Sequence, residues 1–265
     1  MNKNTFTKVT LGKGEMNVYD FGTVKLHAYK TNDFIDDEVF IVEKDEKAVI
    51  IEAPCFYDNE NELKTYISDN GLKVEGLLLA YHMAGAKFMQ GTKVYATKNA
   101  DEYGHNGGGA GLIKNFTGAF GEIFDNNIYT VTNYIEAGKV TIGGIDFNIT
   151  ITSDAFDIEI PEINAVYTHM LGHDCHSIVA GAGHADAIIS QLDGYLKNDY
   201  TLVLTSHYTP EDLKDVEVKI AYLKDLKAVA KTVLTPYEFK AECKKKFQGY
   251  GGENYLEMTA GFFFA

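Results

Sequence analysis

The sequence predicts an α/β protein, a four-layer αβ/βα sandwich that forms a single domain over residues 1–265. Three observations support this fold class. The apolar run Gly76–Ala80 is short and bounded by glycines, which is typical of a fully buried strand. The chain falls into two similar halves rich in strand patterns, about residues 1–125 and 126–265. Each half is closed by helical patterns, and helices on the outer faces of two packed sheets produce four layers.

The first half contains three strand patterns, a helix and the buried strand. Period-two alternation predicts strands over residues 23–30 and 38–43, and an apolar run predicts a third over 47–53, with Asp45-Glu46 as the hairpin turn between the last two. Residues 58–70 open with acidic side chains and are closed by Gly71, which predicts a helix. The glycine-rich stretch 103–121 lacks the Gly-Lys-Ser/Thr of a phosphate loop, so we expect a mobile loop over the site mouth.

The second half repeats this plan. It contains strand patterns, with Gly143-Gly144 as a two-residue hairpin turn, and it ends in helices of which the last two begin with proline. The expected strands cover residues 127–131, 139–142, 145–152, 162–170 and 200–205, and the expected helices cover 185–196, 210–231 and 236–247. We expect the segment Met258–Ala265 to pack on the body of the protein or on another subunit, as in a homo-oligomer.

Composition and charge exclude several classes of protein. Of the 265 residues 45% are hydrophobic, the net charge is −14, and the chain contains no arginine. Without the planar guanidinium fork and with so acidic a balance, a nucleic-acid partner is not expected. No apolar run approaches the ~20 residues of a membrane span, so no membrane association is expected. The cysteines Cys55, Cys175 and Cys243 are odd in number and match no disulfide framework, which favours a cytoplasmic location.

The stretch Val74–Gly85 (VEGLLLAYHMAG) runs from the buried strand into Tyr81-His82. Here the chain resembles the metallo-β-lactamase fold superfamily, whose strand runs into the metal-binding signature His-x-His-x-Asp-His. The resemblance covers residues 24–231 and rests on the order of elements and on His82 and His207, which match the signature's first histidine and the family's final Gly-His turn. Within the signature, the positions after His82 read Met83, Ala84, Gly85, Ala86 and Lys87.

Other motif positions depart from the family pattern. The Asp-Thr-Gly turn reads Glu52-Ala53-Pro54, the next histidine ligand position reads Ala155, and the bridging Asp position reads Met170 or, shifted by one, His169. The resemblance therefore implies the fold together with a degenerate site in which most metal ligands are replaced. An alanine has no lone pair to offer a metal.

A dense cluster of histidines offers alternative metal ligands. Four of the eight histidines fall within 16 residues, beginning at His169 at the end of a buried strand. Histidine, aspartate and cysteine are suitable ligand types. A relocated site built from His82, His169 and His207 would carry one non-standard metal ion, zinc or iron, or these residues act in acid–base chemistry without one. The residues that would assist in binding are His173, Asp174 and His176.

Two side chains leave further alternatives open. Lys87 would neutralise the vacated pocket, paired with Asp154, Asp174 or a bound anion, and its pKa should be depressed if no anion accompanies it. Cys175 lies between two histidines, so it is either an activated thiolate or an inert buried thiol.

Two functions from different classes fit these observations. The first is a hydrolase-like protein that attacks an ester, thioester or lactone in a small-molecule ligand, with His82, His169 and His207 as its catalytic residues. The second is a non-catalytic small-ligand-binding or assembly module that has lost the metal chemistry. Metal analysis is the cheapest way to separate them.

Overall fold

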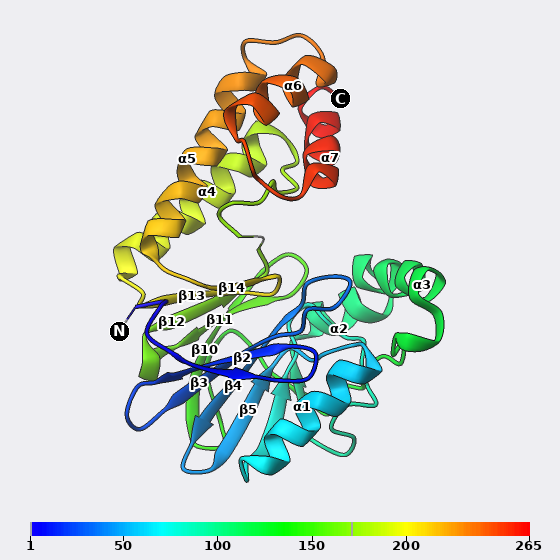
Figure 1. Ribbon diagram of the computed structural model, residues 1–265, viewed down its shortest axis with the longest axis vertical. Helices are drawn as coiled ribbons and strands as arrows, with labels where there is room; N and C mark the ends of the chain where they lie inside the picture. Colours follow the sequence, from blue (N-terminus) through cyan, green and yellow to red (C-terminus); the bar gives the residue numbers. More distant parts are fainter. Residues whose placement is uncertain (1, 171) are drawn as a thin grey trace.

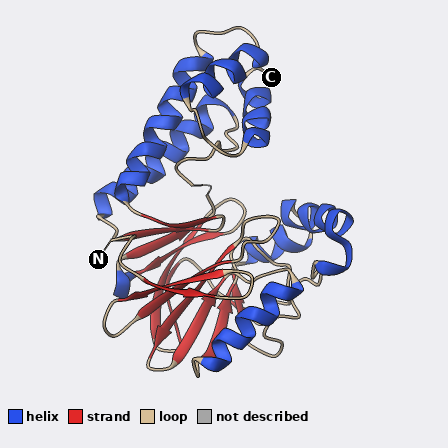
Figure 2. Ribbon diagram, viewed as in Figure 1, coloured by secondary structure: helices blue, strands red, loops and turns tan. Residues whose placement is uncertain are grey.

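The structure is a computed structural model that describes residues 2–170 and 172–265. Two β-sheets pack against each other, with helices on their outer faces (Figures 1 and 2). The first sheet contains eight strands in sequence order: β1 (Thr7–Thr10), β2 (Glu15–Asp20), β3 (Lys25–Lys30), β4 (Glu38–Lys44), β5 (Lys47–Ile51), β6 (Lys73–Leu78), β7 (Val94–Ala96) and β8 (Asn133–Tyr134). The predicted αβ/βα arrangement is confirmed.

The second sheet has the order β14-β13-β12-β11-β10-β9 and holds six strands, β9 (Gly138–Ile142), β10 (Ile145–Ile151), β11 (Phe156–Ile160), β12 (Ala165–Thr168), β13 (Leu202–Thr205) and β14 (Tyr208–Glu211). Most neighbours are antiparallel, but β12 and β13 run parallel, with Thr168 opposite Thr205. Two parallel strands in this register end at the same edge of the sheet. The residues that follow them therefore leave the sheet side by side.

The main core fills the space between the sheets. Its large side chains, which include Phe40, Phe147, Phe156 and Tyr167, are fully buried. Each such side chain contributes roughly 1.5–3 kcal/mol through removal of apolar surface from water. The predicted hairpin turns are confirmed, since Asp45-Glu46 joins β4 to β5 and Gly143-Gly144 joins β9 to β10, with all four residues at positive φ.

Helix α1 (Tyr57–Asp69) covers the first sheet through Leu63 and Ile67. Helices α4 (Gly181–Asn198) and α5 (Leu213–Ala230) contact the second sheet at one end and extend beyond it (Figure 1). There they pack with α6 (Pro236–Lys246) and α7 (Glu253–Phe263) around a second apolar core. Among the described residues, no helix is both apolar and long enough to cross a bilayer.

The glycine-rich stretch 103–121 is helical, so the prediction of a loop there was wrong. It belongs to α2 (Lys98–His105) and α3 (Gly108–Phe120), followed by the 3-10 turn η1 (Gly121–Ile123). The Thr97 side chain caps α2 by accepting a hydrogen bond from the amide of Ala100. Packing of the aromatic side chains of α3 on the sandwich overrides the low helix propensity of glycine.

Three further boundaries differ from the sequence expectation. Residues 127–131 form no strand. The first sheet instead includes β8, so the part of the chain that forms this sheet extends past the expected boundary at residue 125 to Tyr134. Residues 161–163 form a 3-10 turn, η2 (Pro161–Ile163), ahead of β12. Pro210 lies in β14 and does not start α5, which begins with a capping box between Asp212 and Asp215. The capping carboxylates accept hydrogen bonds from free amides at the start of the helix, whereas a proline there would only remove one of these amides.

Candidate metal centre

Three histidines from separate elements meet at one edge of the sandwich. His169 directly follows β12, His207 lies in the turn between β13 and β14, and His82 follows β6 of the opposite sheet. The parallel register of β12 and β13 places His169 beside His207. One nitrogen from each ring lies within 4.8 Å of a nitrogen of the other two. The ring centroids are 5.0–5.4 Å apart.

The closest approach in this triad is between Nε2 of His169 and Nε2 of His207, at 3.3 Å. Two nitrogens at this distance repel each other unless a proton or a cation lies between their lone pairs. His169 also stacks on the ring of Tyr81, with centroids 4.5 Å apart, which restricts rotation of the imidazole. The triad thus presents converging lone pairs in fixed orientations.

A buried carboxylate, Asp37, lies behind the triad. Its Oδ1 is 3.3 Å from Nδ1 of His207 and 3.7 Å from Nδ1 of His82. Within the described part of the chain, Asp37 Oδ1 and His82 Nδ1 are both buried without a hydrogen-bond partner. A carboxylate at Nδ1 holds an imidazole in the tautomer that leaves Nε2 free to bind a metal. We did not predict Asp37 from the sequence, because no motif marks the last residue of a loop before a strand.

The electrostatics follow from burial and from these contacts. Burial alone would raise the pKa of Asp37, but His82 and His207 outweigh it and lower the pKa. Burial would lower the pKa of His207, yet the contact with Asp37 raises it above the ordinary value. The crowded surroundings of the ring, together with His207 and His82, lower the pKa of His169, although part of this residue is open to solvent. The pKa of His207 is therefore raised and that of His169 is lowered, so the two neighbouring imidazoles differ in their affinity for a proton.

The loop that carries His82 is held by Glu52, which is fully buried at the end of β5. Its carboxylate accepts hydrogen bonds from the amides of Tyr81 at 2.8 Å and His82 at 3.0 Å. It also accepts one from the hydroxyl of Tyr167 at 2.5 Å. Tyr167 in turn contacts the hydroxyl of Ser206 at 2.7 Å. Glu52 therefore connects the His82 loop to the turn that carries His207.

Comparison with known protein families and with curated proteins found no match. Solved structures do match. A stereoselective inverting sec-alkylsulfatase from Pseudomonas sp. aligns with a TM-score of 0.62 at 15% identity, over 89% of this chain and 48% of its own. A metallo-β-lactamase family protein from Thermus thermophilus gives 0.62 at 12% identity, over 90% and 91%. A metallo-β-lactamase from Erythrobacter litoralis gives 0.59 at 12% identity, over 83% and 100%.

This chain has the metallo-β-lactamase fold. The resemblance inferred from the order of elements and from His82 and His207 is thereby confirmed at the level of the fold. The chain spans about half the length of the sulfatase that it matches. Likenesses at 12–15% identity establish the fold alone.

Two alanines that the resemblance aligned with ligand positions, Ala84 and Ala155, lie in apolar packing. Ala84 is buried in a cluster with Cys55, Phe56 and Phe124. Ala155 is fully buried in the main core. Neither side chain carries a donor atom that could bind a metal.

The donor set of the triad fits one metal ion. In a tetrahedral zinc site with Zn–N bonds of about 2.0–2.1 Å, neighbouring nitrogens are separated by about 3.3 Å. The nitrogens of His169 and His207 already have this separation. Three histidines with a carboxylate behind them form a recognised donor set for catalytic zinc. The residues present are therefore compatible with a single zinc ion.

Lys87 lies in a different environment from the one expected. Its ammonium group donates to the hydroxyl of Tyr57 at 2.8 Å and lies 4.8 Å from the centre of that ring. The hydrogen bond to Tyr57, with Asp125 and Glu60 nearby, raises the pKa of Lys87; a depressed value was expected only in the absence of an accompanying anion. The side chain is exposed, and its recorded partners include neither Asp154 nor Asp174.

The remaining cluster residues do not join the triad. His173 bonds through Nδ1 to Glu211 at 2.7 Å, and its Nε2 lies 3.5 Å from Asp215. His176 is buried against the aromatic rings of the helical core and contacts the hydroxyl of Tyr222 at 3.1 Å. Asp174 is exposed, and its main-chain carbonyl accepts from the amide of Gly251 at 3.2 Å.

Cys175 is a poor candidate for an activated nucleophile. Burial raises the pKa of its thiol, and the nearby Lys219 offsets this only in part. The thiol donates to the carbonyl of His176 at 3.4 Å. The structure therefore favours the inert alternative for this residue.

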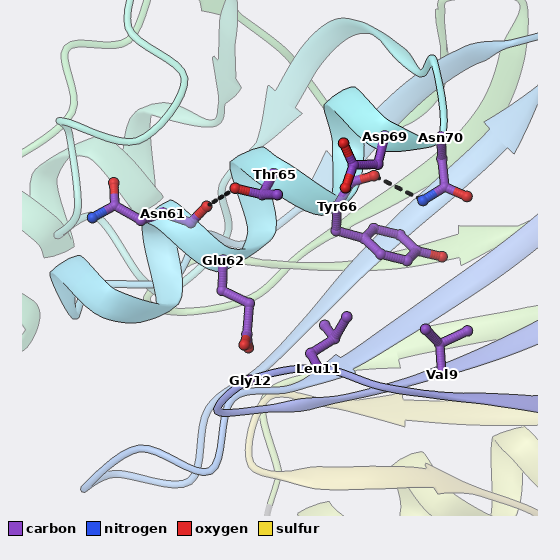
Figure 3. Close-up of a pocket in the computed structure, with 9 residues that line it drawn as sticks. All are labelled: Val9, Leu11, Gly12, Asn61, Glu62, Thr65, Tyr66, Asp69 and Asn70. Atoms are coloured by element: carbon purple, nitrogen blue, oxygen red, sulfur yellow. Dashed lines mark hydrogen bonds between the residues drawn. The ribbon is translucent and has the colours of Figure 1, made fainter.

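A separate groove of about 530 Å³ lies between α1 and the segment around β1 (Figure 3). It contains none of the residues predicted for the site. Its most prominent carboxylate, Glu62, already accepts hydrogen bonds from the amides of Lys13 and Gly14 and from the hydroxyl of Tyr29. This groove therefore stands apart from the histidine triad in both position and chemistry.

Proposed function

We propose that this chain is a hydrolase with a single metal ion, zinc, held by His82, His169 and His207. The observation that carries the proposal is the convergence of three imidazoles, two of which are 3.3 Å apart at Nε2, in front of a buried carboxylate. The substrate is an ester, thioester or lactone in a small molecule, as in the hydrolytic chemistry that this fold supports elsewhere. A zinc ion bound there would act as a Lewis acid on the substrate oxygen and would lower the pKa of a water molecule.

The protein's own residues prepare this site. The carbonyl of Ile35, 3.2 Å from Nδ1 of His207, accepts the proton at that nitrogen and so keeps Nε2 available, with the Asp37 carboxylate 3.3 Å away favouring the same proton position. Glu52 fixes the main chain at Tyr81 and His82. Burial raises the pKa of Tyr81 to about 12, so its hydroxyl is a neutral donor at pH 7, bonded to Thr152 at 2.9 Å. The ligand nitrogens of the three histidines already lie within 4.8 Å of one another.

One observation favours a different class of function. The ligand positions at Ala84 and Ala155 are occupied by buried methyl groups, which excludes donors there. A protein that binds a small ligand without turning it over would tolerate this loss. In that case the triad would bind a proton or an anion and no metal.

Elemental analysis of protein purified without added metal separates the two functions. One zinc per chain, lost in a His82→Ala/His207→Ala variant, is expected for the hydrolase. Hydrolysis of 4-nitrophenyl acetate should fall at least a hundredfold in the same variant and after treatment with a chelator. His105→Ala, which removes an exposed histidine on α2, is the matched control. Metal-free protein whose thermal stability does not change with zinc or with chelator would overturn the proposal. Iron in place of zinc would show that the bound metal is iron.

A further inference from the structure

An aromatic cluster adjoins the triad on the side facing α3. It is formed by phenylalanines from the loop after β3, from the residue before α1, from α3 and from the segment after it: Phe34, Phe56, Phe116, Phe120 and Phe124. Phe34 stacks on Phe120 with ring centroids 5.3 Å apart. Phe34 is nevertheless 64% exposed, and exposed aromatic surface of this kind is characteristic of binding sites.

The side chains exposed around this cluster are largely apolar, although Asp36 and Glu122 are exposed beside it in the sequence. Two neighbouring side chains, Leu112 and Ile123, are 47% and 49% exposed. Helix α3 contains one charged residue, Lys114, in a protein whose net charge is −14. Apart from Lys114, the side chains that α3 exposes are uncharged, which suits a neutral apolar ligand.

This apolar surface is continuous with the candidate metal centre. The carbonyl of Ile35, the residue after Phe34, lies 3.2 Å from Nδ1 of His207. Cys55 and Ala84 form the inner side of the same cluster. The thiol of Cys55 lies 3.6 Å from Asp37, the carboxylate behind the triad. A ligand whose reactive group reached the histidines could therefore extend directly over the aromatic rings.

We propose that the aromatic cluster binds the alkyl or acyl chain of the substrate, so that the hydrolase of the preceding section acts on esters, thioesters or lactones with a hydrophobic chain. This inference rests on the proposed function for the reaction, but the binding of an apolar chain at Phe34 is a separate property. Ala84 is buried on the inner side of the cluster and adds apolar contacts beneath the rings.

The protein contains no tryptophan, so a Phe34→Trp variant carries a single fluorescent reporter at the exposed end of the cluster. It is titrated with 1-butanol, 1-hexanol, 1-octanol and 1-decanol, none of which can be hydrolysed. We expect a saturable blue shift with a Kd that falls about two- to fourfold for each added methylene. Phe120→Ser in this background should weaken the binding of 1-decanol at least tenfold. Leu234→Ser, which removes a side chain that is 89% exposed near α6, should leave it unchanged.

The kinetic counterpart compares 4-nitrophenyl octanoate with 4-nitrophenyl acetate. Phe34→Ser should lower the ratio of their kcat/KM values at least tenfold, whereas Leu234→Ser should not change it. Alkanol binding without hydrolysis of either ester would support the apolar chain site and overturn only the proposed reaction. Ester hydrolysis without chain-length dependence in either experiment would overturn the chain site. A dimer in sedimentation that Phe34→Ser dissociates, with no alkanol binding, would identify the surface as a contact between two copies and overturn the inference.

Discussion

Nε2 of His169 lies 3.3 Å from Nε2 of His207, although the two residues are 38 positions apart in the sequence. The parallel pairing of β12 with β13 produces this approach, because Thr168 and Thr205 are register partners at the ends of these strands. The separation equals the edge of a tetrahedral zinc site. Asp37 and Glu52 then determine how the imidazoles are presented, and both make specific predictions.

Replacing Asp37 with Asn should weaken zinc binding. The carboxylate faces Nδ1 of both His207 and His82, and loss of such a partner of a metal ligand typically costs about 10–100-fold in affinity. Competition with a chromophoric chelator measures the effect. Asp58→Asn is the control, because its side chain is 83% exposed on α1. Equal zinc affinity in the Asp37→Asn variant and the wild type would contradict the assigned role.

Replacing Glu52 with Gln should destabilise the protein. The buried carboxylate accepts hydrogen bonds from two main-chain amides and from Tyr167, and an amide group has only one oxygen to offer them. We expect a loss of about 2 kcal/mol in the free energy of unfolding, measured in urea. The exposed Glu136→Gln should change it by less than about 0.5 kcal/mol. A loss of the same size in both variants would show that Glu52 has no special role.

Asp157 makes stability depend on pH. This residue on β11 accepts a hydrogen bond from Gln191 of α4 at 2.8 Å, and burial raises its pKa to about 6. Because the folded protein favours the protonated acid, ionisation costs stability: the cost is absent below about pH 4 and complete above about pH 6. Asp157→Asn should therefore stabilise the fold by about 2 kcal/mol at pH 7.5 and give no gain at pH 4. A gain of equal size at both pH values would rule out this cause.

His173 should change stability with pH in the same direction as Asp157, because its pKa is also raised in the folded protein, but here the protonated form is stabilised by a charge partner. Its hydrogen bond to Glu211 raises the pKa against the effect of burial, with support from Asp215. A raised histidine pKa contributes stability that is complete below about pH 6.5 and is lost as the pH rises through the folded-state value. His173→Gln should thus lower stability by about 1 kcal/mol at pH 5.5 and by less at pH 9. His105→Gln, at an exposed position, serves as control, and a loss independent of pH would refute the prediction.

Several parts of the fold could be predicted from local sequence because local physics governs them. The turns Asp45-Glu46 and Gly143-Gly144 lie between alternating strands, and the two glycines adopt positive φ without steric cost. The helix over residues 58–70 follows from an apolar face and an acidic first turn, and α1 covers Tyr57–Asp69. His82 and His207 were identified because each follows an apolar strand whose end can be located in the sequence.

Other features depend on contacts that the sequence pattern does not reveal. The stretch 103–121 contains enough glycine to suggest a loop, but packing of Phe116 and Phe120 on the sandwich makes it helical. Lys87 follows the signature histidine closely, yet its side chain pairs with Tyr57 outside the triad. Proximity in sequence was a poor guide to these contacts.

Residue type and short-range periodicity were enough to predict the order of most strands and helices, and the resemblance that rests on this order, His82 and His207 implied the metallo-β-lactamase type of fold. They could not establish which members of the histidine cluster face one another, or that Asp37 lies behind them. That outcome depends on strand register and on the packing of one sheet against the other, which join residues far apart in the chain. His169 therefore joins the triad, while His173 and His176 are directed to partners in β14 and α5.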